Sequence, residues 1–268
     1  MITTEEHITT ETKLKRIAWL SSQDKCRQFN QLMHHFNEES LLCCYHELDA
    51  KKAIGIDKVS KESYAVNLLE NLKDLVSRLK SMSYIPGNVR LVEIPKEGAK
   101  GKTRTLGISN FEDKLVQKMM SKVLESIYEP IFLKSSFGFR PGIGCHDAIK
   151  SLRNHLYSNE TRYVIDIDLA NFFGSIDRKL LVQILEAKIK DKKLIRYIQR
   201  MFRAGILSKG ELVIEEDGLI QGSGCSPIIA NIFAHEVIDT WFEETVKTYC
   251  KGKVELFRYA DDAVIACE

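Results

Sequence analysis

The feature that most constrains this chain is an apolar, strand-like segment near its end that two adjacent carboxylates interrupt. The segment covers residues 257–266, and Asp261 and Asp262 lie between apolar residues on both sides. Asp favours turns because its side chain bonds nearby backbone groups, so the pattern predicts a β-hairpin with two acids at its tip. A rigid tip of this kind suits a divalent-cation site in a nucleic-acid polymerase, although Asp-Asp in a turn is by itself more often structural.

A second strand that ends in acid strengthens the metal interpretation. Residues 162–168 are apolar up to Asp166 and Asp168, whose i, i+2 spacing puts both on one face of a regular strand. Two Mg²⁺ ions about 4 Å apart need several hard oxygen ligands on rigid elements. The candidate ligands are the carboxylates of Asp168, Asp261 and Asp262 and the backbone carbonyl of Leu169. Carboxylates this close repel unless a cation neutralises them, and Asp166 is interpreted as satisfying local donors.

Two further segments have the composition of nucleotide contacts. A hairpin predicted over residues 89–108 has glycines at its tip and basic side chains that can bind a triphosphate: Arg90, Lys96, Lys100, Lys102 and Arg104. Gln221 lies in a Gly-rich loop before a predicted helix, where it can hydrogen-bond a base or sugar edge. Both segments also fit ordinary structure, as a solvated charged hairpin and a helix N-terminal loop.

Two adjacent aromatics, Phe172 and Phe173, follow the acidic strand. Packing in the core is the usual role of such a pair. Phe173 is five positions past Asp168, however, where its ring can sit beneath the sugar of an incoming nucleotide. A ring there would exclude a ribose 2′-OH and admit deoxyribose.

Composition is ordinary for a globular protein and excludes several classes. Hydrophobic residues make up 44% of the 268 residues and charged residues 28%. No run of 18 apolar residues occurs, and the seven scattered cysteines include no CxxC, which disfavours a membrane span, a disulfide framework and a zinc site. Net charge is only +2, but residues 71–160 hold 15 Lys and Arg against 9 Asp and Glu. That bias fits a phosphate backbone or a solvated surface.

Periodicity predicts an α+β fold in which antiparallel strand pairs mix with helices. Residues 1–20 are polar and too weakly periodic to predict a firm element. Helices are expected over residues 25–52, 63–82, 111–128, 147–156, 178–190, 192–203 and 228–248. Strands are expected over residues 89–95, 103–108, 162–168 and 212–215, with a closing hairpin over 253–267.

Taken together, the motifs resemble those of reverse transcriptases, most closely the group II intron-encoded type. Residues 137–142, Phe-Gly-Phe-Arg-Pro-Gly, are the most family-specific stretch. Residues 168–173 resemble the first catalytic motif, with Gly174 where the family usually has Asp. Residues 221–231 resemble the second, and Tyr259-Ala260-Asp261-Asp262 is the third. Residues 53–57 and 94–104 resemble two earlier blocks, so the resemblance covers the chain from about residue 53 to its end.

The resemblance implies a right-hand polymerase: a largely helical N-terminal extension over residues 1–52, fingers over 53–160, and a palm over 161–268 with a mainly antiparallel sheet flanked by helices. It implies that Asp168, Asp261 and Asp262 are catalytic and, with Leu169, bind two Mg²⁺ ions, for which Mn²⁺ can substitute. The implied nucleotide-binding residues are Arg90, Lys96, Arg104, Ala170, Phe173 and Gln221.

The implied activity is RNA-directed DNA synthesis, in which dNTPs are added to a DNA or RNA primer on an RNA template. Intron RNA would be a further partner in splicing, and the oligomeric state is left open, with a homodimer possible. The family continues past the third motif into the rest of the palm and a thumb. We therefore interpret the chain as an N-terminal portion that extends primers poorly by itself, and expect a bacterial cytoplasmic location.

Other functions fit parts of the same pattern. A related bacterial reverse transcriptase could act in phage defence or CRISPR-linked acquisition. A maturase could keep the fold and bind RNA without chemistry, although the three intact aspartates argue against that. An RNA-dependent RNA polymerase needs a polar group that accepts the 2′-OH, and Phe173 would exclude this hydroxyl.

Overall fold

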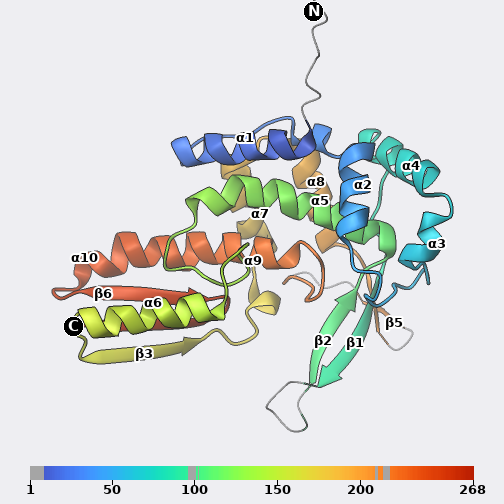
Figure 1. Cartoon of the computed structure of the whole chain (residues 1–268). Coiled ribbons are helices and arrows are strands. Elements are labelled where there is room, and N and C mark those ends of the chain that lie inside the picture. The colour runs from blue at the N-terminus through green and yellow to red at the C-terminus, as the bar shows by residue number, and fades with distance from the viewer. Residues whose placement is uncertain (1–8, 96–100, 102, 209–210, 214–217) are drawn as a thin grey trace, which may run out of the picture.

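The computed structural model describes residues 9–95, 101, 103–208, 211–213 and 218–268 (Figure 1). Its longer helices are α1 (Thr10–Gln23), α2 (Glu38–Glu47), α4 (Leu68–Lys80), α5 (Phe111–Tyr128), α6 (Cys145–Ser158), α7 (Arg178–Lys188), α8 (Lys192–Phe202) and α9 (Ser226–Ala234). Shorter helical pieces are η1 (Leu32–His35), α3 (Lys61–Ala65), η2 (Glu129–Ile131), η3 (Phe173–Ser175), η4 (His235–Asp239), η5 (Phe242–Val246) and α10 (Lys247–Tyr249). The strands are β1 (Val89–Pro95), β2 (Thr103–Ile108), β3 (Tyr163–Asp168), β4 (Ile206–Ser208), β5 (Glu211–Val213), β6 (Val254–Tyr259) and β7 (Asp262–Cys267).

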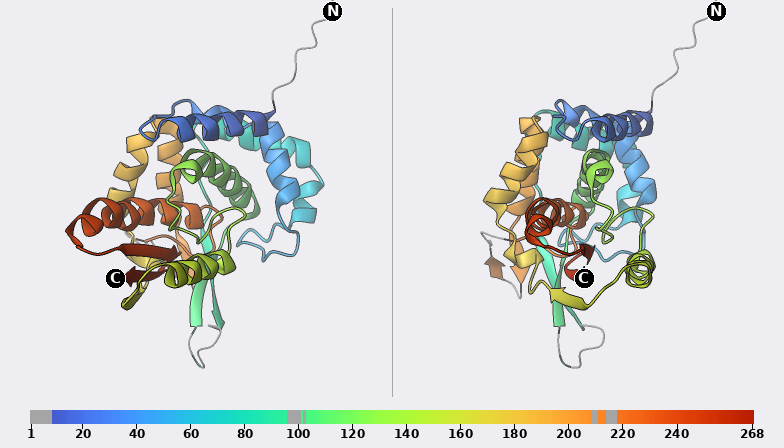
Figure 2. Two further views of the ribbon diagram at one scale, coloured as in Figure 1. Left: turned by 60° about the vertical axis from the view of Figure 1, so that its left-hand side comes forward. Right: turned by 90° about the vertical axis from the view of Figure 1, so that its left-hand side faces the viewer.

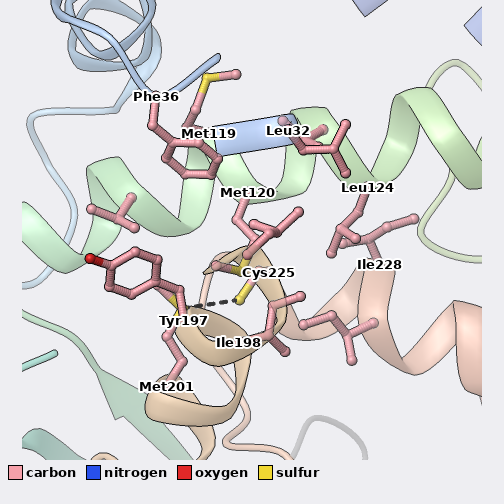
Figure 3. Close-up of a cluster of buried hydrophobic side chains, with 14 of the residues drawn as sticks. Leu32, Phe36, Met119, Met120, Leu124, Tyr197, Ile198, Met201, Cys225 and Ile228 are labelled. Atoms are coloured by element: carbon pink, nitrogen blue, oxygen red, sulfur yellow. Dashed lines mark hydrogen bonds between the residues drawn. The ribbon is translucent and has the colours of Figure 1, made fainter. Parts of the chain in front are cut away.

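Helix α5 is the centre of the fold. Its apolar residues recur around most of its circumference, and 12 of its 18 residues are buried, as expected for a helix covered on several sides. Helices α1, α2 and α9 contact it, and α7 and α8 lie on the side opposite α2 to α4 (Figure 2). Met119, Met120 and Leu124 of α5 meet Tyr197 and Ile198 of α8 in the same core cluster (Figure 3). The N-terminal helices therefore share one core with the rest of the chain.

Two small sheets complete the α+β fold. The first has the order β2-β1-β4-β5, and the second has the order β3-β7-β6. Every pairing is antiparallel except that of β1 with β4, where Val89 lies opposite Ile206. The fold class is thus confirmed, while β4 and its parallel pairing were not predicted.

The β6–β7 hairpin is packed on both faces. Phe257 and Ala266 pack toward Leu152 of α6, and Leu256 and Ala263 pack toward Phe242 of η5. Burial on both faces explains why apolar residues occur on both faces of the hairpin instead of alternating with polar ones. The packing fixes the position of the turn between its strands.

Several predicted helix limits were wrong. Residues 10–23 form α1 despite their weak periodicity, and the helix predicted over 25–52 reduces to η1 and α2 because Gln31 has a left-handed φ of 54°. The long helix predicted from residue 228 contains two π-helical stretches, η4 and η5. No helix in the described ranges is long and apolar enough to cross a membrane.

Candidate active site

Strand register brings the three predicted catalytic acids together. Asp168, the last residue of β3, lies directly opposite Asp262, the first residue of β7. Residues directly opposite in an antiparallel pair have their Cβ atoms about 4.5–5.5 Å apart on the same face. The amide of Leu169 also donates to the carbonyl of Asp261 at 3.2 Å. The end of β3 is therefore bound to the hairpin tip.

The tip itself has a strained backbone. Tyr259 pairs with Asp262 across a two-residue turn, and Ala260 in that turn has a φ of +58°, a region that non-glycine residues rarely adopt. Gly138 lies against this turn so closely that a Cβ there would be 2.2 Å from the amide nitrogen of Ala260. The loop over residues 137–142 thus packs against the turn of the Tyr259–Asp262 motif.

A buried ionic network fixes the turn. Arg258 is 0% exposed, and its guanidinium donates two hydrogen bonds to Asp239, of 2.6 and 2.7 Å. It also donates to the carbonyl of Ala260 and to Oδ1 of Asn231, both at 3.0 Å. Burial alone would raise the pKa of Asp239, but the hydrogen bonds from Arg258 lower it below its ordinary value, helped by His235, whose Nδ1 lies 3.8 Å from the carboxylate.

Sequence reasoning missed this network. The available signal was Arg258, a charged residue flanked by the apolar and aromatic residues Leu256, Phe257 and Tyr259. Its partner Asp239 is on η4, so only the fold reveals the pair.

The acids repel one another. Asp262 has a raised pKa, first because of burial and then because of the charges of Asp261, Asp168 and Asp166. Within the described part of the chain, no three His, Cys, Asp or Glu side chains converge into a ready metal cluster. The donors are nevertheless hard carboxylate oxygens with unrelieved negative charge, which fits Mg²⁺ or Mn²⁺.

A broad cleft of about 1050 Å³ opens beside these acids. Asp168 and Asp261 line it, whereas Asp262 is not among its lining residues. The predicted metal ligand Leu169 also lines it, as do four of the predicted nucleotide contacts, Arg104, Ala170, Phe173 and Gln221. Residues of the β1–β2 hairpin, the end of β3 and the loop before α9 therefore border one space. Arg104 borders it although it lies opposite Ile94, on the hairpin face that also carries Arg90.

Phe172 and Phe173 have different environments. Both residues border the cleft, but Phe172 is a buried member of the main core, whereas Phe173 is only partly buried and packs against that core. The ring of Phe173 contacts Phe139 edge-on at 5.9 Å and Phe172 at 5.8 Å. Two neighbouring rings thus hold Phe173 at the cleft wall. Gly174, which departs from the family pattern, lies so close to Asn171 that a Cβ would be 2.5 Å from its side chain.

The loop that carries Gln221 is locked to β2. The amide of Gly107 donates to the carbonyl of Gln221 at 2.6 Å. Gly222 has a φ of +98°, and a Cβ there would lie 2.6 Å from the Gly107 carbonyl. The amide of Gly224 donates to Gln117 of α5 at 2.8 Å. These bonds hold the loop in place independently of helix capping, since Cys225 at the N-cap of α9 makes no side-chain cap bond.

Two predicted phosphate contacts are not placed at the cleft. Arg90 does not line it, and its guanidinium donates to the carbonyl of Ile54 at 2.8 Å. Arg90 lies opposite Ile108, whereas the cleft residue Leu91 lies opposite Gly107, so the two side chains leave opposite faces of the hairpin. Lys96 falls outside the described residues. The roles of Arg90 and Lys96 stay predictions.

Comparison with known proteins agrees with this arrangement. Residues 94–268 match the family described as Reverse transcriptase (RNA-dependent DNA polymerase). The chain belongs to the reverse transcriptase family. It is 32% identical over 225 residues to the group II intron-encoded protein LtrA of Lactococcus lactis subsp. cremoris, a match that covers 84% of this chain and 37% of LtrA.

Other relatives of this reverse transcriptase agree with the group II intron type. It is 31% identical to the putative COX1/OXI3 intron 1 protein of Saccharomyces cerevisiae, a match that covers 82% of this chain and 26% of that protein. Among solved structures, a chain of a partial Cas6-RT-Cas1–Cas2 complex is similar with a TM-score of 0.48 and 18% identity, over 87% of this chain and 37% of that one. The match to LtrA spans just over a third of the length of that relative.

Proposed function

We propose that this chain is the fingers and palm portion of an RNA-directed DNA polymerase of group II intron type. The observation that carries the proposal is the register of Asp168 against Asp262, with Asp168 and Asp261 facing the cleft that Arg104, Phe173 and Gln221 also line. Nucleotidyl transfer requires carboxylates that can bind metal ions and a cationic side chain that can bind the triphosphate. An aromatic side chain beside the sugar can select between ribose and deoxyribose.

In the proposed reaction, a primer 3′-OH attacks the α-phosphate of a dNTP paired with an RNA template. Bound divalent ions would stabilise the attacking and leaving oxygens. Asp168 and Asp261 would hold those ions, with Asp262 and the Leu169 carbonyl beside them. Arg104 would bind the triphosphate, Gln221 and Ala170 would contact the nucleotide, and Phe173 would exclude a ribose 2′-OH.

The names of the relatives support an intron-linked role. They include intron-encoded proteins and a nuclear intron maturase of Arabidopsis thaliana, 28% identical over 131 residues. We therefore propose intron RNA as template and splicing partner, in a bacterial cytoplasm, in preference to a role in phage defence or CRISPR-linked acquisition.

Metal binding and nucleotide addition test the proposal together. Mn²⁺ titration followed by electron paramagnetic resonance should give specific binding that Asp168→Asn and Asp261→Asn each weaken at least about tenfold, because each removes one anionic ligand. Asp166→Asn is the matched control, since it removes a neighbouring charge on the same strand, and it should leave the affinity nearly unchanged.

The second readout is addition of a single dNTP to a labelled primer on an RNA template at high protein concentration. The wild-type chain should form a small amount of product, and Asp261→Asn should form none. Product that Asp261→Asn retains, or Mn²⁺ affinity that neither cleft variant changes, would refute the proposal.

A further inference from the structure

Positive charge is concentrated in one short part of the chain. Residues 178–203, which form α7 and α8, hold nine Lys and Arg against two Asp and Glu, a net charge of +7. The whole chain has a net charge of only +2, so the remaining residues carry −5. A solvated surface normally mixes both signs, and a concentration of this size indicates an anionic partner.

The outer face of α8 displays part of this charge, whereas Arg178 and Arg200 donate to backbone carbonyls of the protein. The inner face of α8 packs Tyr197, Ile198 and Met201 into the core (Figure 3). Its outer face exposes Lys192, Lys193 and Arg196, and Lys190 is exposed at the corner between α7 and α8. Among the described residues, none of these four side chains forms an ion pair with a carboxylate. Their charges are therefore available to a ligand.

A shallow depression of about 590 Å³ lies at this corner. Lys190, Lys192 and Lys193 line one side of it, and Asn30, Gln31, Met33 and His34 line the other. Ammonium and amide donors of this kind bind phosphate oxygens.

The acid in the depression is already used by the protein. Asp191 is 6% exposed, and one of its oxygens accepts the amides of Lys193 and Leu194. Its other oxygen accepts the amide of Met33 at 3.0 Å. Asp191 therefore fixes the corner against the 30–34 segment and leaves the lysines to face outward.

The preceding segment extends the basic surface. Phe29 bridges to Ile189, and the side chain of Lys188 donates to the carbonyl of Lys25. This pairing brings the exposed Lys25 and Arg27 beside the α7–α8 corner. Asp24 precedes Lys25 in the sequence and Glu186 precedes Lys190, but cations outnumber these carboxylates on this surface.

The surface is separate from the active site. The α7–α8 corner lies at the end of the molecule beside α1, whereas the β1–β2 hairpin projects from the opposite end (Figures 1 and 2). None of Lys190, Lys192, Lys193 and Arg196 lines the catalytic cleft. A nucleic acid bound at the corner would leave the cleft open.

We propose that this α8 surface, formed by Lys25, Arg27, Lys190, Lys192, Lys193 and Arg196, docks the sugar–phosphate backbone of folded, base-paired RNA. The many point charges and few directional side chains suit backbone contacts rather than base reading. The choice of RNA over DNA rests on the proposed function. The protein would hold a structured RNA here while the cleft acts on another segment.

The test is fluorescence anisotropy of a labelled RNA hairpin with the whole chain, between about 50 and 200 mM salt. The triple variant Lys190→Ala, Lys192→Ala, Lys193→Ala should bind at least about tenfold more weakly at the lower salt, and the slope of log affinity against log salt should fall by roughly 0.9 per lost phosphate contact. The matched control is Lys73→Ala, Lys80→Ala, Lys150→Ala, which removes the same charge from exposed positions on α4 and α6.

The control triple should bind the hairpin nearly as wild type does. An unchanged affinity in the α8 triple, or an equal loss in both triples, would overturn the proposal. A DNA hairpin of the same sequence should bind more weakly than the RNA, and equal or tighter DNA binding would overturn the choice of RNA. Asp261→Asn should bind the RNA hairpin as wild type does. Failure of the proposed catalytic role and failure of the proposed RNA docking can therefore be distinguished.

Discussion

Asp239→Ala would leave the guanidinium of Arg258 buried without its anionic partner. Both side chains are 0% exposed, so water cannot replace the lost hydrogen bonds. Breaking a buried ion pair from one side costs about 3–5 kcal/mol. For a chain of this size we expect the Tm to fall by roughly 2–4 °C per kcal/mol, or about 6–20 °C in total.

Urea and thermal unfolding measure that loss, and two further variants make it specific. Lys247→Ala removes ion pairs to Glu243 and Glu255 at the surface, and should cost less than about 1 kcal/mol. The double variant Asp239→Leu, Arg258→Met removes both charges and should be more stable than Asp239→Ala, because no unpaired charge stays buried.

The same variant reports on the active site and on pH. Arg258 also binds the Ala260 carbonyl, so Asp239→Ala should weaken Mn²⁺ binding while Lys247→Ala does not. Because the pKa of Asp239 is lowered by folding, its contribution is present above its unfolded pKa and is lost as the pH falls through the folded value. The difference in the free energy of unfolding between wild type and Asp239→Ala should therefore become smaller at acid pH. A gap under about 1 kcal/mol at neutral pH would refute the role of this pair.

Three other predictions follow from single residues. Burial raises the pKa of Asp113 to about 6, although hydrogen bonds from Tyr84 and Gly87 act in the opposite direction. The folded form therefore holds the proton more tightly than the unfolded form, and stability should fall as the pH rises from about 4 to 6. In urea unfolding, the stability difference between wild type and Asp113→Asn should change by about 2 kcal/mol over that range. Gly138→Ala puts a Cβ against the backbone of Ala260 and should lower the free energy of unfolding by at least about 2 kcal/mol. Gly142→Ala, where φ is +72° but the surrounding space is open, should lower it by about 1 kcal/mol. Equal losses in the two variants would contradict the contact between Gly138 and Ala260. Phe173→Ala should raise incorporation of ribonucleotides relative to deoxyribonucleotides in primer extension, and unchanged sugar selectivity would count against the gate.

Local sequence patterns correctly predicted the elements that are decided by residues close to one another in the sequence. The limits of α5 were predicted as found, because its apolar periodicity is continuous from Phe111 to Tyr128. Both predicted hairpins formed, since alternation and turn residues decide them within a few positions. The approach of Asp168 to the hairpin tip was predicted from two strand ends that carry acids, and the motif resemblance implied the same three aspartates.

Features that depend on distant contacts could not be predicted in this way. The pairing of Val89 with Ile206 joins strands more than a hundred positions apart. Alternation alone decides which residues share a face with Arg90, but which face of the hairpin borders the cleft depends on distant contacts such as that between Gly107 and Gln221. Nothing in the local pattern around Asp239 distinguishes a buried ion-pair partner from an exposed helix residue.

The arrangement around the third motif reconciles two opposing needs. The proposed metal role requires Asp168, Asp261 and Asp262 to keep their negative charge, yet burial first and repulsion from the neighbouring acids next raise the pKa of Asp262. A free guanidinium beside them would relieve that repulsion and compete with the metal. Arg258 avoids this because Asp239 neutralises it and because its bond to the turn is to the neutral carbonyl of Ala260. The hairpin tip is therefore held by a cation whose charge Asp239 balances, and the carboxylates keep the negative charge that the proposed metal site requires.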